Sequence, residues 1–600
     1  MAKATIGRRR KQLQRAPGRA STSDVPWPSR RLQAAAIFLT AVCLIGLLSA
    51  EIGDTDFWWH LKTGQYITEH HALPVPDPFA YTTSLAPASA AGQQVRHFNL
   101  THEWLSQVLM YGVFRLTGFA GIVLGRAFLL AAFCGLAGFL AARLAASFYA
   151  GIAAACAAAS VMVAFTADRP GLVSFLGVAV VVTLLELRRG WWAIPPLLLL
   201  WANCHGGFIL GWLVLLVYAV ASLPVWPFRA KDGASPRLWL ITVGAIAISG
   251  LNPNGFGVVS TVLAYRRSPL TADLIEWHRP SLWGEPYGFD LLLYAAALVL
   301  LLSWRKVRPA HWMLFAAFAA ASLMAFRNTP LIGFLAPVLI AKYFPFRLRA
   351  PRVLAWALPV AALGFAAAGF APGRFLELRA AAWNLPEGAA NFLAEHRIAG
   401  PIFNTYEQGG YLIWRLWPGQ RVFIDGRALS EGVYQDYNRI VYNAGSYADQ
   451  VVGPRQELLD RYGVQAVVMN TMDYVSGTLY PLALALANPA TTDWQLVYDD
   501  LQAVVFVRYP PADVPVLSNK LGRILRHMDR ECTADIENSP DTPLCARTLA
   551  RYWLSNGVTD EARGMLVLYL AHAPRDRQAE QMLRDLDAGK AQPPGRTEGR

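Results

Sequence analysis

The sequence predicts a polytopic α-helical membrane protein with a polar C-terminal part. Of its 600 residues, 54% are hydrophobic and only 16% are charged, whereas charged residues make up about 25% of an ordinary soluble domain. The apolar residues recur in runs about as long as a hydrocarbon core is thick. After about residue 371 these long runs give way to short segments of another period. Disorder, a fibrous protein and a disulfide scaffold are therefore excluded.

The first 31 residues form a basic tail. Nine Lys and Arg residues precede or adjoin the first apolar run, against the single acid Asp24. A basic stretch beside a membrane span stays on the cytoplasmic side, so we expect residues 1–31 to lie in the cytoplasm, next to the cytoplasmic (inner) membrane of a bacterium. The net charge of +13 thus reflects the membrane, and no nucleic-acid partner is expected. The run after the tail is too long for a cleaved signal peptide.

About eleven membrane spans are expected, within a transmembrane domain at residues 32–370. Apolar runs lie at residues 32–50, 119–142, 149–166, 171–187, 191–203, 207–225, 237–251, 289–303, 312–326, 330–341 and 353–370. The loops that then lie inside carry Lys and Arg, as the positive-inside rule requires. The odd number of spans places everything after residue 370 outside. The first outside loop, at 52–104, is long and aromatic.

Residues 371–510 are expected to form an extracytoplasmic α/β domain. Short strands are predicted at Pro401–Tyr406, Arg421–Asp425, Ala466–Met469 and Ala503–Arg508. Residues 511–590 contain a pattern that resembles a tetratricopeptide helical pair, and 591–600 are expected to be a disordered tail. Cys532 and Cys545 share this segment and could form a disulfide if it is exported, which the sequence leaves open.

The clearest candidate site follows the first span, in EIGDTDFWWHLKTGQYITEH. Asp54 and Asp56 stand at a membrane surface, where unpaired charges are costly and usually have a function. Asp56 is predicted to be a general base or a metal ligand, with Asp54 in support. The alternative is structural, with the acids capping a helix whose aromatic residues form an interfacial belt.

This segment resembles the first external loop of the GT-C glycosyltransferases, multispan enzymes that use polyprenyl-phosphate-linked sugars. An outward Asp, an aromatic pair, His and a basic residue are followed by a Pro-Asp-Pro turn at 76–78. The likeness is closest to the catalytic subunit of oligosaccharyltransferase. It implies that Asp56 takes the position of the catalytic aspartate, with His60 and Lys62 following as substrate-binding residues.

A second likeness lies in FNTYEQGGYLIWRLWPGQRVFIDGRAL, which resembles the WWDYG region of oligosaccharyltransferases. It implies an acceptor groove built from Tyr406, Tyr411, Asp425 and Arg427. The chain has Tyr-Glu-Gln-Gly-Gly-Tyr in place of that motif, and its glycines can equally be tight turns. Residues 50–510 also resemble uncharacterised bacterial membrane proteins with DxDxWWHL, HGGF and FIDGR in this order, a family without an established substrate.

Two further acids are candidate metal ligands. Asp168 is placed at the outer end of the third span, where GT-C enzymes often have a second acidic motif, and Glu276 resembles the glutamate of their large external loop. Asp56, Asp168 and Glu276 could therefore hold a divalent cation, Mg²⁺ or Mn²⁺, although spaced carboxylates do not require one. The alternatives are an ion pair between Asp168 and Arg169 and a solvated Glu276.

Other polar residues at the predicted outer helix ends are expected to bind substrate. They are Arg169, His205, Arg327 and Asn328. Arg327 could grip a phosphate bidentately, or it could be a snorkelling arginine at the interface. His205 could be a metal ligand or a substrate contact, or it could be a hydrogen-bonded structural histidine.

Together these features predict transfer of a sugar from a polyprenyl-phosphate-linked donor to a protein, glycan or lipid acceptor on the outer face of the membrane. Two alternatives remain open. One is a noncatalytic anchor or scaffold with a periplasmic interaction domain. The other is a transporter of lipid-linked solutes, although the expected mid-membrane acids and internal repeats are not evident.

Overall fold

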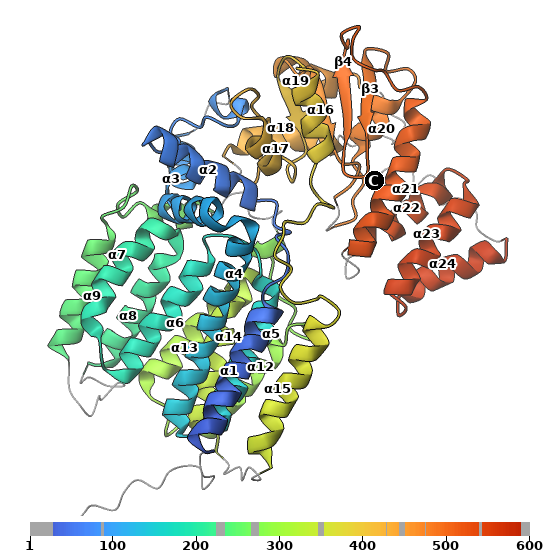
Figure 1. The fold of residues 1–600 in the computed structure, drawn as a ribbon. Helices are drawn as coiled ribbons and strands as arrows, with labels where there is room; N and C mark the ends of the chain where they lie inside the picture. Colours follow the sequence, from blue (N-terminus) through green and yellow to red (C-terminus); the bar gives the residue numbers. More distant parts are fainter. Residues whose placement is uncertain are drawn as a thin grey trace, which may run out of the picture.

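The computed structural model shows a bundle of apolar helices joined to a mixed α/β domain (Figure 1). It describes residues 28–85, 89–223, 235–265, 275–345, 353–427, 429–442, 451–473, 476–538 and 543–589. Nearly all of the expected basic tail and all of the expected C-terminal tail at 591–600 lie outside the described residues.

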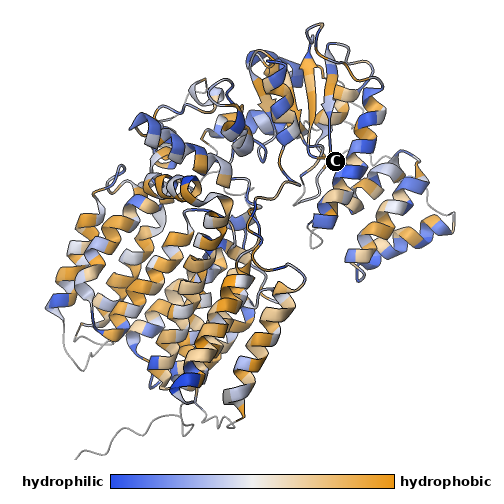
Figure 2. Ribbon diagram, in the orientation of Figure 1, coloured by the Kyte–Doolittle hydropathy of each residue, from blue (hydrophilic) through white to orange (hydrophobic). Residues whose placement is uncertain are grey.

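The bundle consists of long apolar helices that lie side by side. They are α1 (Arg30–Leu47), α4 (Trp104–Ala145), α5 (Phe148–Met162), α6 (Leu172–Leu187), α7 (Ile194–Cys204), α8 (Ile209–Ala221), α9 (Pro236–Ser249), α12 (Phe289–Leu302), α13 (Pro309–Met324), α14 (Thr329–Tyr343) and α15 (Leu354–Phe370). Figure 2 shows hydrophobic residues along the length of these helices, on the outside of the bundle as well. A surface of this kind suits contact with lipid.

Three segments of the described chain are long and apolar enough to cross a membrane by length and composition: Arg30–Leu47, Gly92–Ala145 and Phe148–Phe165. Several shorter apolar helices accompany them. The number of about eleven spans therefore stays a prediction. Helix α4 begins well before the apolar run expected at 119–142, and a break at Gly118, where φ is 64°, separates its first part from the rest.

Helix α14 lies at the centre of the bundle, since every residue from Thr329 to Leu339 is buried. It packs against α4, α5 and α12. A helix that is apolar all round is stable only when it is enclosed in this way. The outer end of α14 therefore gives a firm base for the segment 326–328 that precedes it.

The first loop, which joins α1 to α4, lies between the bundle and the mixed α/β domain, which is named the outer domain for its predicted position (Figure 1). It contains α2 (Phe57–His70), η1 (Tyr81–Ser84) and α3 (Ala90–Thr101), and α10 (Val258–Tyr265) packs on α3. Helix α2 lies closely on α4, because a Cβ at Gly64 would be only 2.0 Å from the backbone oxygen of Gln107. Glycine at this position therefore allows the two helices to touch.

The outer domain contains a four-stranded sheet in the order β1-β2-β4-β3, with β1 parallel to β2 and the other pairs antiparallel. Its strands are β1 (Ile402–Asn404), β2 (Ala466–Met469), β3 (Trp494–Asp499) and β4 (Val504–Arg508). Its helices are α16 (Glu387–Glu395), α17 (Gly409–Leu416), α18 (Glu431–Tyr442), α19 (Pro454–Arg461) and α20 (Pro481–Ala487). The register pairs Phe403 with Val467, and Val467 with Phe506.

The prediction of a strand at Arg421–Asp425 is wrong. This segment does not join the sheet, because Val422 forms an isolated parallel bridge with Ala80 of the first external loop. The Thr82 hydroxyl also donates to the carbonyl oxygen of Phe423 at 2.5 Å. The loop and the outer domain consequently share one apolar core, in which Phe57 packs with residues such as Leu412 and Val422.

Helices α21 (Lys520–Asn538), α22 (Leu544–Ser555), α23 (Thr559–His572) and α24 (Arg577–Asp587) follow the sheet. A disulfide between Cys532 and Cys545 joins α21 to α22. The buried side chains of these helices are continuous with the core of the outer domain. The terminal helices are thus packed onto that domain, and their likeness to a tetratricopeptide unit stays a prediction.

Candidate functional site

Arg169 stands at the centre of a group of three carboxylates. Its Nε and Nη2 atoms lie 2.5 and 2.9 Å from the two carboxylate oxygens of Asp54, which gives a bidentate pair. The same Nη2 is 3.0 Å from Oδ2 of Asp56, and Nη1 is 3.4 Å from Oε2 of Glu276. Charge-assisted bonds of this geometry are among the strongest in proteins, so one guanidinium holds together acids from two distant loops.

The neighbouring Asp168 makes a different ion pair. It is bound to Arg126 of α4, and both side chains are only 2% exposed. Arg126 also donates to the carbonyl oxygen of Ala50 at the end of α1. The ion pair of Asp168 that the sequence left open is thus made with Arg126, and Arg169 is free to reach the first loop. Arg126 was not predicted from the sequence as a partner of an acid. The available signal was that an arginine lies within the apolar run 119–142.

Asp56 lies where α2 begins. Its Oδ1 accepts a hydrogen bond of 3.0 Å from the indole of Trp59, and its backbone N–H donates to Oδ1 of Asp54. Gly426 of the outer domain approaches so closely that a Cβ there would be 1.8 Å from Asp56 Oδ1. The catalytic candidate is therefore enclosed by the first loop, the Arg169 loop and the outer domain.

The two aspartates differ in acidity. Burial raises the pKa of Asp56 to about 6, against the opposing charge of Arg169, and the negative charge of Asp54 adds to the rise. Burial also opposes ionisation of Asp54, but the charge and hydrogen bonds of Arg169 lower its pKa below the usual value. Arg169 thus favours the ionised form of Asp54, whereas Asp56 can exchange a proton near neutral pH.

Arg327 extends the group on the side of Glu276. Its Nη1 lies 3.0 Å from Oε1 of Glu276, and its guanidinium stands 4.7 Å from the centre of the Trp277 ring. The side chain is 33% exposed, so it can also meet a ligand. Asn328 instead donates to the backbone oxygen of Ala321 at 3.0 Å, which is a structural contact.

A second polar cluster surrounds Glu103, directly before α4. The carboxylate lies 3.6 Å from His60 Nδ1, 3.4 Å from His102 Nε2 and 3.6 Å from His205 Nε2. Burial lowers the pKa of His60 to about 4 and that of His205 to about 3, although Glu103 opposes both shifts. These two imidazoles are therefore neutral at physiological pH, with Ser174 holding His205 at 2.6 Å.

Three residues of this cluster could hold a metal ion. The ligand atoms of His102, Glu103 and His205 all lie within 4.8 Å of one another. His102 Nδ1 donates to the carbonyl oxygen of Phe98 at 2.8 Å, so Nε2 is the ring nitrogen that is left on the side of Glu103. His102 and Glu103 were not predicted from the sequence to be metal ligands. The only signal for them was that a His and a Glu stand next to each other at the end of the loop 52–104.

The residues expected to line an acceptor groove lie in two places. Tyr406 is near the carboxylates, since its hydroxyl donates to the carbonyl oxygen of Gly426 at 3.0 Å. Tyr411 is buried in α17, and its ring meets that of Trp58 at 4.9 Å. Lys62, expected to bind substrate, is also engaged in packing. Its Nζ lies 5.4 Å from the ring centre of Trp414 and 5.3 Å from that of Trp417.

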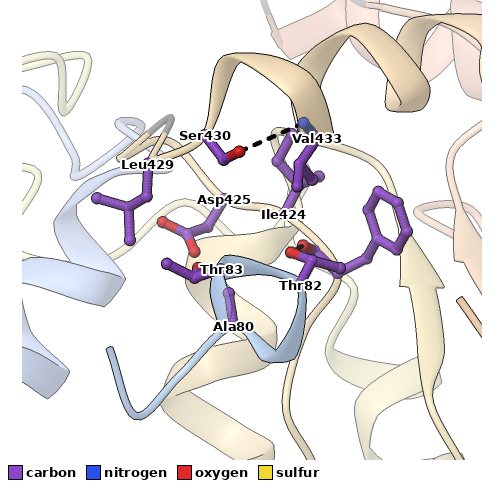
Figure 3. Close-up of a pocket in the computed structure, with 9 residues that line it drawn as sticks. Ala80, Thr82, Thr83, Ile424, Asp425, Leu429, Ser430 and Val433 are labelled. Atoms are coloured by element: carbon purple, nitrogen blue, oxygen red, sulfur yellow. Dashed lines mark hydrogen bonds between the residues drawn. The ribbon is translucent and has the colours of Figure 1, made fainter. Parts of the chain in front are cut away.

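Asp425 and Arg427 form a buried network with Asp77 of the Pro-Asp-Pro turn. Arg427 lies 2.6 Å from Asp425 and 2.8 Å from Asp77, and each of these side chains is at most 3% exposed. Figure 3 shows Asp425 beside Thr82 and Thr83 of η1 in a small pocket between the first loop and the outer domain. These charges join two parts of the structure and are closed to an acceptor.

The residues expected to bind a divalent cation do not form one ligand set. Asp168 is paired with Arg126, whereas Asp56 and Glu276 are both held by Arg169. Each oxygen of Asp56 and Glu276 already lies within 3.4 Å of an N–H nitrogen. The donor atoms therefore do not fit a cation at this place, and among the described residues the one compact group of ligand atoms is that around Glu103.

Two solved structures to which the chain is similar are oligosaccharyltransferases of Archaeoglobus fulgidus. The apo enzyme shares 12% identity over 82% of this chain and 76% of that chain, with a TM-score of 0.46. The AglB oligosaccharyltransferase, solved with an inhibitory peptide and a dolichol-phosphate, shares 11% identity over 83% of this chain and 78% of that chain, with a TM-score of 0.45. Both belong to the family that the first-loop motif resembles.

No family model and no curated protein matches the chain. The resemblance to uncharacterised bacterial membrane proteins therefore stays a prediction. At identities of 11–12% and TM-scores below 0.5, the similarity to the archaeal enzymes concerns the course of the chain alone. The function must accordingly be inferred from the residues of this chain.

Proposed function

We propose that the chain is a membrane glycosyltransferase of GT-C type. It transfers a sugar from a polyprenyl-phosphate-linked donor to an acceptor on the outer face of the cytoplasmic membrane. The observation that carries the proposal is the pairing of Asp56, a carboxylate with a pKa of about 6, with Arg169, which shares Glu276 with Arg327. A base and a positive region side by side are what transfer from a sugar phosphate needs.

Asp56 is the general base in this reaction. An acceptor hydroxyl or amide attacks the anomeric carbon of the sugar, and its proton passes to the Asp56 carboxylate as the new bond forms. The bond between the anomeric carbon and the phosphate oxygen breaks, and its electron pair stays on the phosphate. A single displacement of this kind inverts the anomeric configuration.

Arg327 is the phosphate-binding residue. It is anchored through Glu276 and Trp277 and is still partly exposed, so its remaining N–H groups can bind phosphate oxygens. As the sugar leaves, negative charge grows on the phosphate, and a fixed guanidinium stabilises that charge more in the transition state than in the ground state.

The proposed orientation puts the N-terminus inside the cell and the α/β domain outside. The basic residues before the first span support this direction. The disulfide between Cys532 and Cys545 also suits an oxidising compartment such as the bacterial periplasm. The acceptor, whether protein, glycan or lipid, is left open, because Tyr411, Asp425 and Arg427 are buried in structural contacts.

The test is transfer of labelled sugar from a panel of polyprenyl-phosphate and polyprenyl-diphosphate donors by the purified full-length protein. Asp56→Asn is expected to lower transfer by about 10²–10⁴-fold, because the base is lost. Glu51→Gln is the matched control, since the Glu51 carboxylate pairs with Arg379 and Trp383 rather than with a residue of the site. Absence of transfer from every donor, or full activity of the folded Asp56→Asn variant, would overturn the proposal.

A further inference from the structure

The carboxylates beside Asp56 are already neutralised by fixed guanidinium groups. Of the six oxygens of Asp54, Asp56 and Glu276, five lie within 3.4 Å of an arginine nitrogen and the sixth accepts from an indole N–H. Arg169 alone accounts for four of them. It thus does for these acids what a bound cation does elsewhere, by holding like charges together.

Arg169 is fixed at this position by its own loop. The adjacent Asp168 is locked to Arg126 in a buried ion pair, and Arg126 is tied in turn to the end of α1. The backbone N–H of Arg169 donates to the carbonyl oxygen of Ala167 at 3.0 Å. The backbone of Arg169 is therefore anchored beside the site, and its guanidinium is held there by the three carboxylates.

A divalent cation and this guanidinium would compete for the same oxygens. A metal ion on Asp56 and Glu276 would lie close to the planar group that now binds them, and the two positive charges would repel each other. Arginine cannot relieve this repulsion by losing its proton, because its pKa is too high, and in this site the acids raise that pKa further against the effect of burial.

We propose that Arg169 takes the place of a divalent cation at these carboxylates. It keeps Asp54, Asp56 and Glu276 in one geometry and supplies positive charge beside the leaving phosphate, so no metal ion is needed there. Its side chain is 38% exposed and thus remains open to a ligand. The catalytic part of this inference rests on the proposed glycosyltransferase function, whereas the part on metal binding does not.

The first experiment measures Mn²⁺ binding by electron paramagnetic resonance, using purified full-length protein that has been treated with a chelator and freed of it. Arg169→Ala uncovers the three carboxylates and is expected to bind one more Mn²⁺ per chain than wild type. Adding Glu276→Gln to Arg169→Ala should abolish that extra site. Mn²⁺ bound around Glu103 would be common to all three proteins and so would cancel in the comparison.

Wild-type protein also gives a test that needs no substitution at Arg169. If wild type binds Mn²⁺ and Glu276→Gln alone removes it, the carboxylates hold a cation in the presence of Arg169 and the inference is overturned. Equal Mn²⁺ binding by wild type and by folded Arg169→Ala overturns it too. If Arg169→Ala does not fold, Arg169→Lys replaces it in the same Mn²⁺ comparison, because one ammonium contacts fewer of the carboxylate oxygens than a guanidinium does.

The second experiment measures sugar transfer. Wild type should keep its rate in excess chelator, and Arg169→Ala should lose about 100-fold or more, with partial recovery when Mn²⁺ is added. If wild type transfers sugar only with Mn²⁺ and Glu276→Gln loses that dependence, the glycosyltransferase function stands and the role of Arg169 fails. If the Mn²⁺ binding is as expected but no donor is used, the proposed function fails and the role of Arg169 in excluding metal stands.

Discussion

The hydrogen bond from Trp59 to Asp56 lowers the pKa of the proposed base against the larger effect of burial, and Trp59→Phe removes that bond while keeping an aromatic ring. The bond is 3.0 Å long and stabilises the ionised carboxylate. A hydrogen bond to a charged group contributes about 1.5–3 kcal/mol, and one pKa unit corresponds to about 1.36 kcal/mol. The pKa of Asp56 should therefore rise by about one to two units, from about 6 to about 7–8.

The base works only when it is deprotonated, so activity falls as the pH drops through its pKa. In a profile of kcat/KM against pH, wild type should lose activity as the pH falls through about 6, and Trp59→Phe should lose it at higher pH. The two proteins should have similar rates above about pH 9, where both carboxylates are ionised.

Trp58→Phe is the control for this experiment, because the Trp58 ring packs on Tyr411 and Phe119 rather than on the carboxylate. Its acid limb should coincide with that of wild type. If the acid limb of Trp59→Phe also coincides with that of wild type, Asp56 is not the titrating base and the reasoning fails.

Two further predictions concern close packing and the disulfide. Gly426→Ala places a methyl group 1.8 Å from Oδ1 of Asp56 and should lower transfer about 100-fold by displacing the base, whereas Gly432→Ala, with no atom within 4 Å, should leave the rate of transfer unchanged. Replacing Cys532 and Cys545 by alanine opens a link across 13 positions and should lower the free energy of unfolding of the outer domain by about 3 kcal/mol. Denaturant titration checks this, and a reducing agent should bring wild type to the same midpoint without affecting the variant.

The sequence predicted most of the secondary structure of the bundle, because long apolar runs and charged loops are properties of single segments. It also indicated that Asp54, Asp56 and Arg327 stand near the ends of helices, as they do. The partner of each charge could not be predicted in the same way. The contact of Arg126 with Asp168 joins positions 42 residues apart, and no local pattern distinguishes it from an ion pair between neighbours.

The outer domain shows a different limit of what can be predicted from the sequence. Arg421–Asp425 has the composition of a strand, and its bridge partner Ala80 lies more than 300 positions earlier in the chain. Tyr411 was expected to meet an acceptor because a motif suggested it, but its position on α17 turns it into the core against Trp58. Which face of a short helix is buried depends on its neighbours, and these are set by tertiary packing rather than by periodicity.

The sharing of one core by the first loop and the outer domain has a consequence for the order in which the protein is made. Thr82 and its partner Phe423 are separated by 341 positions. At about 5–20 residues per second, Thr82 is synthesised roughly 20–70 s before the segment that completes its contacts. During that interval Asp56 also lacks Gly426, so a ribosome that stalls within the bundle leaves a protein whose candidate site has not yet been assembled.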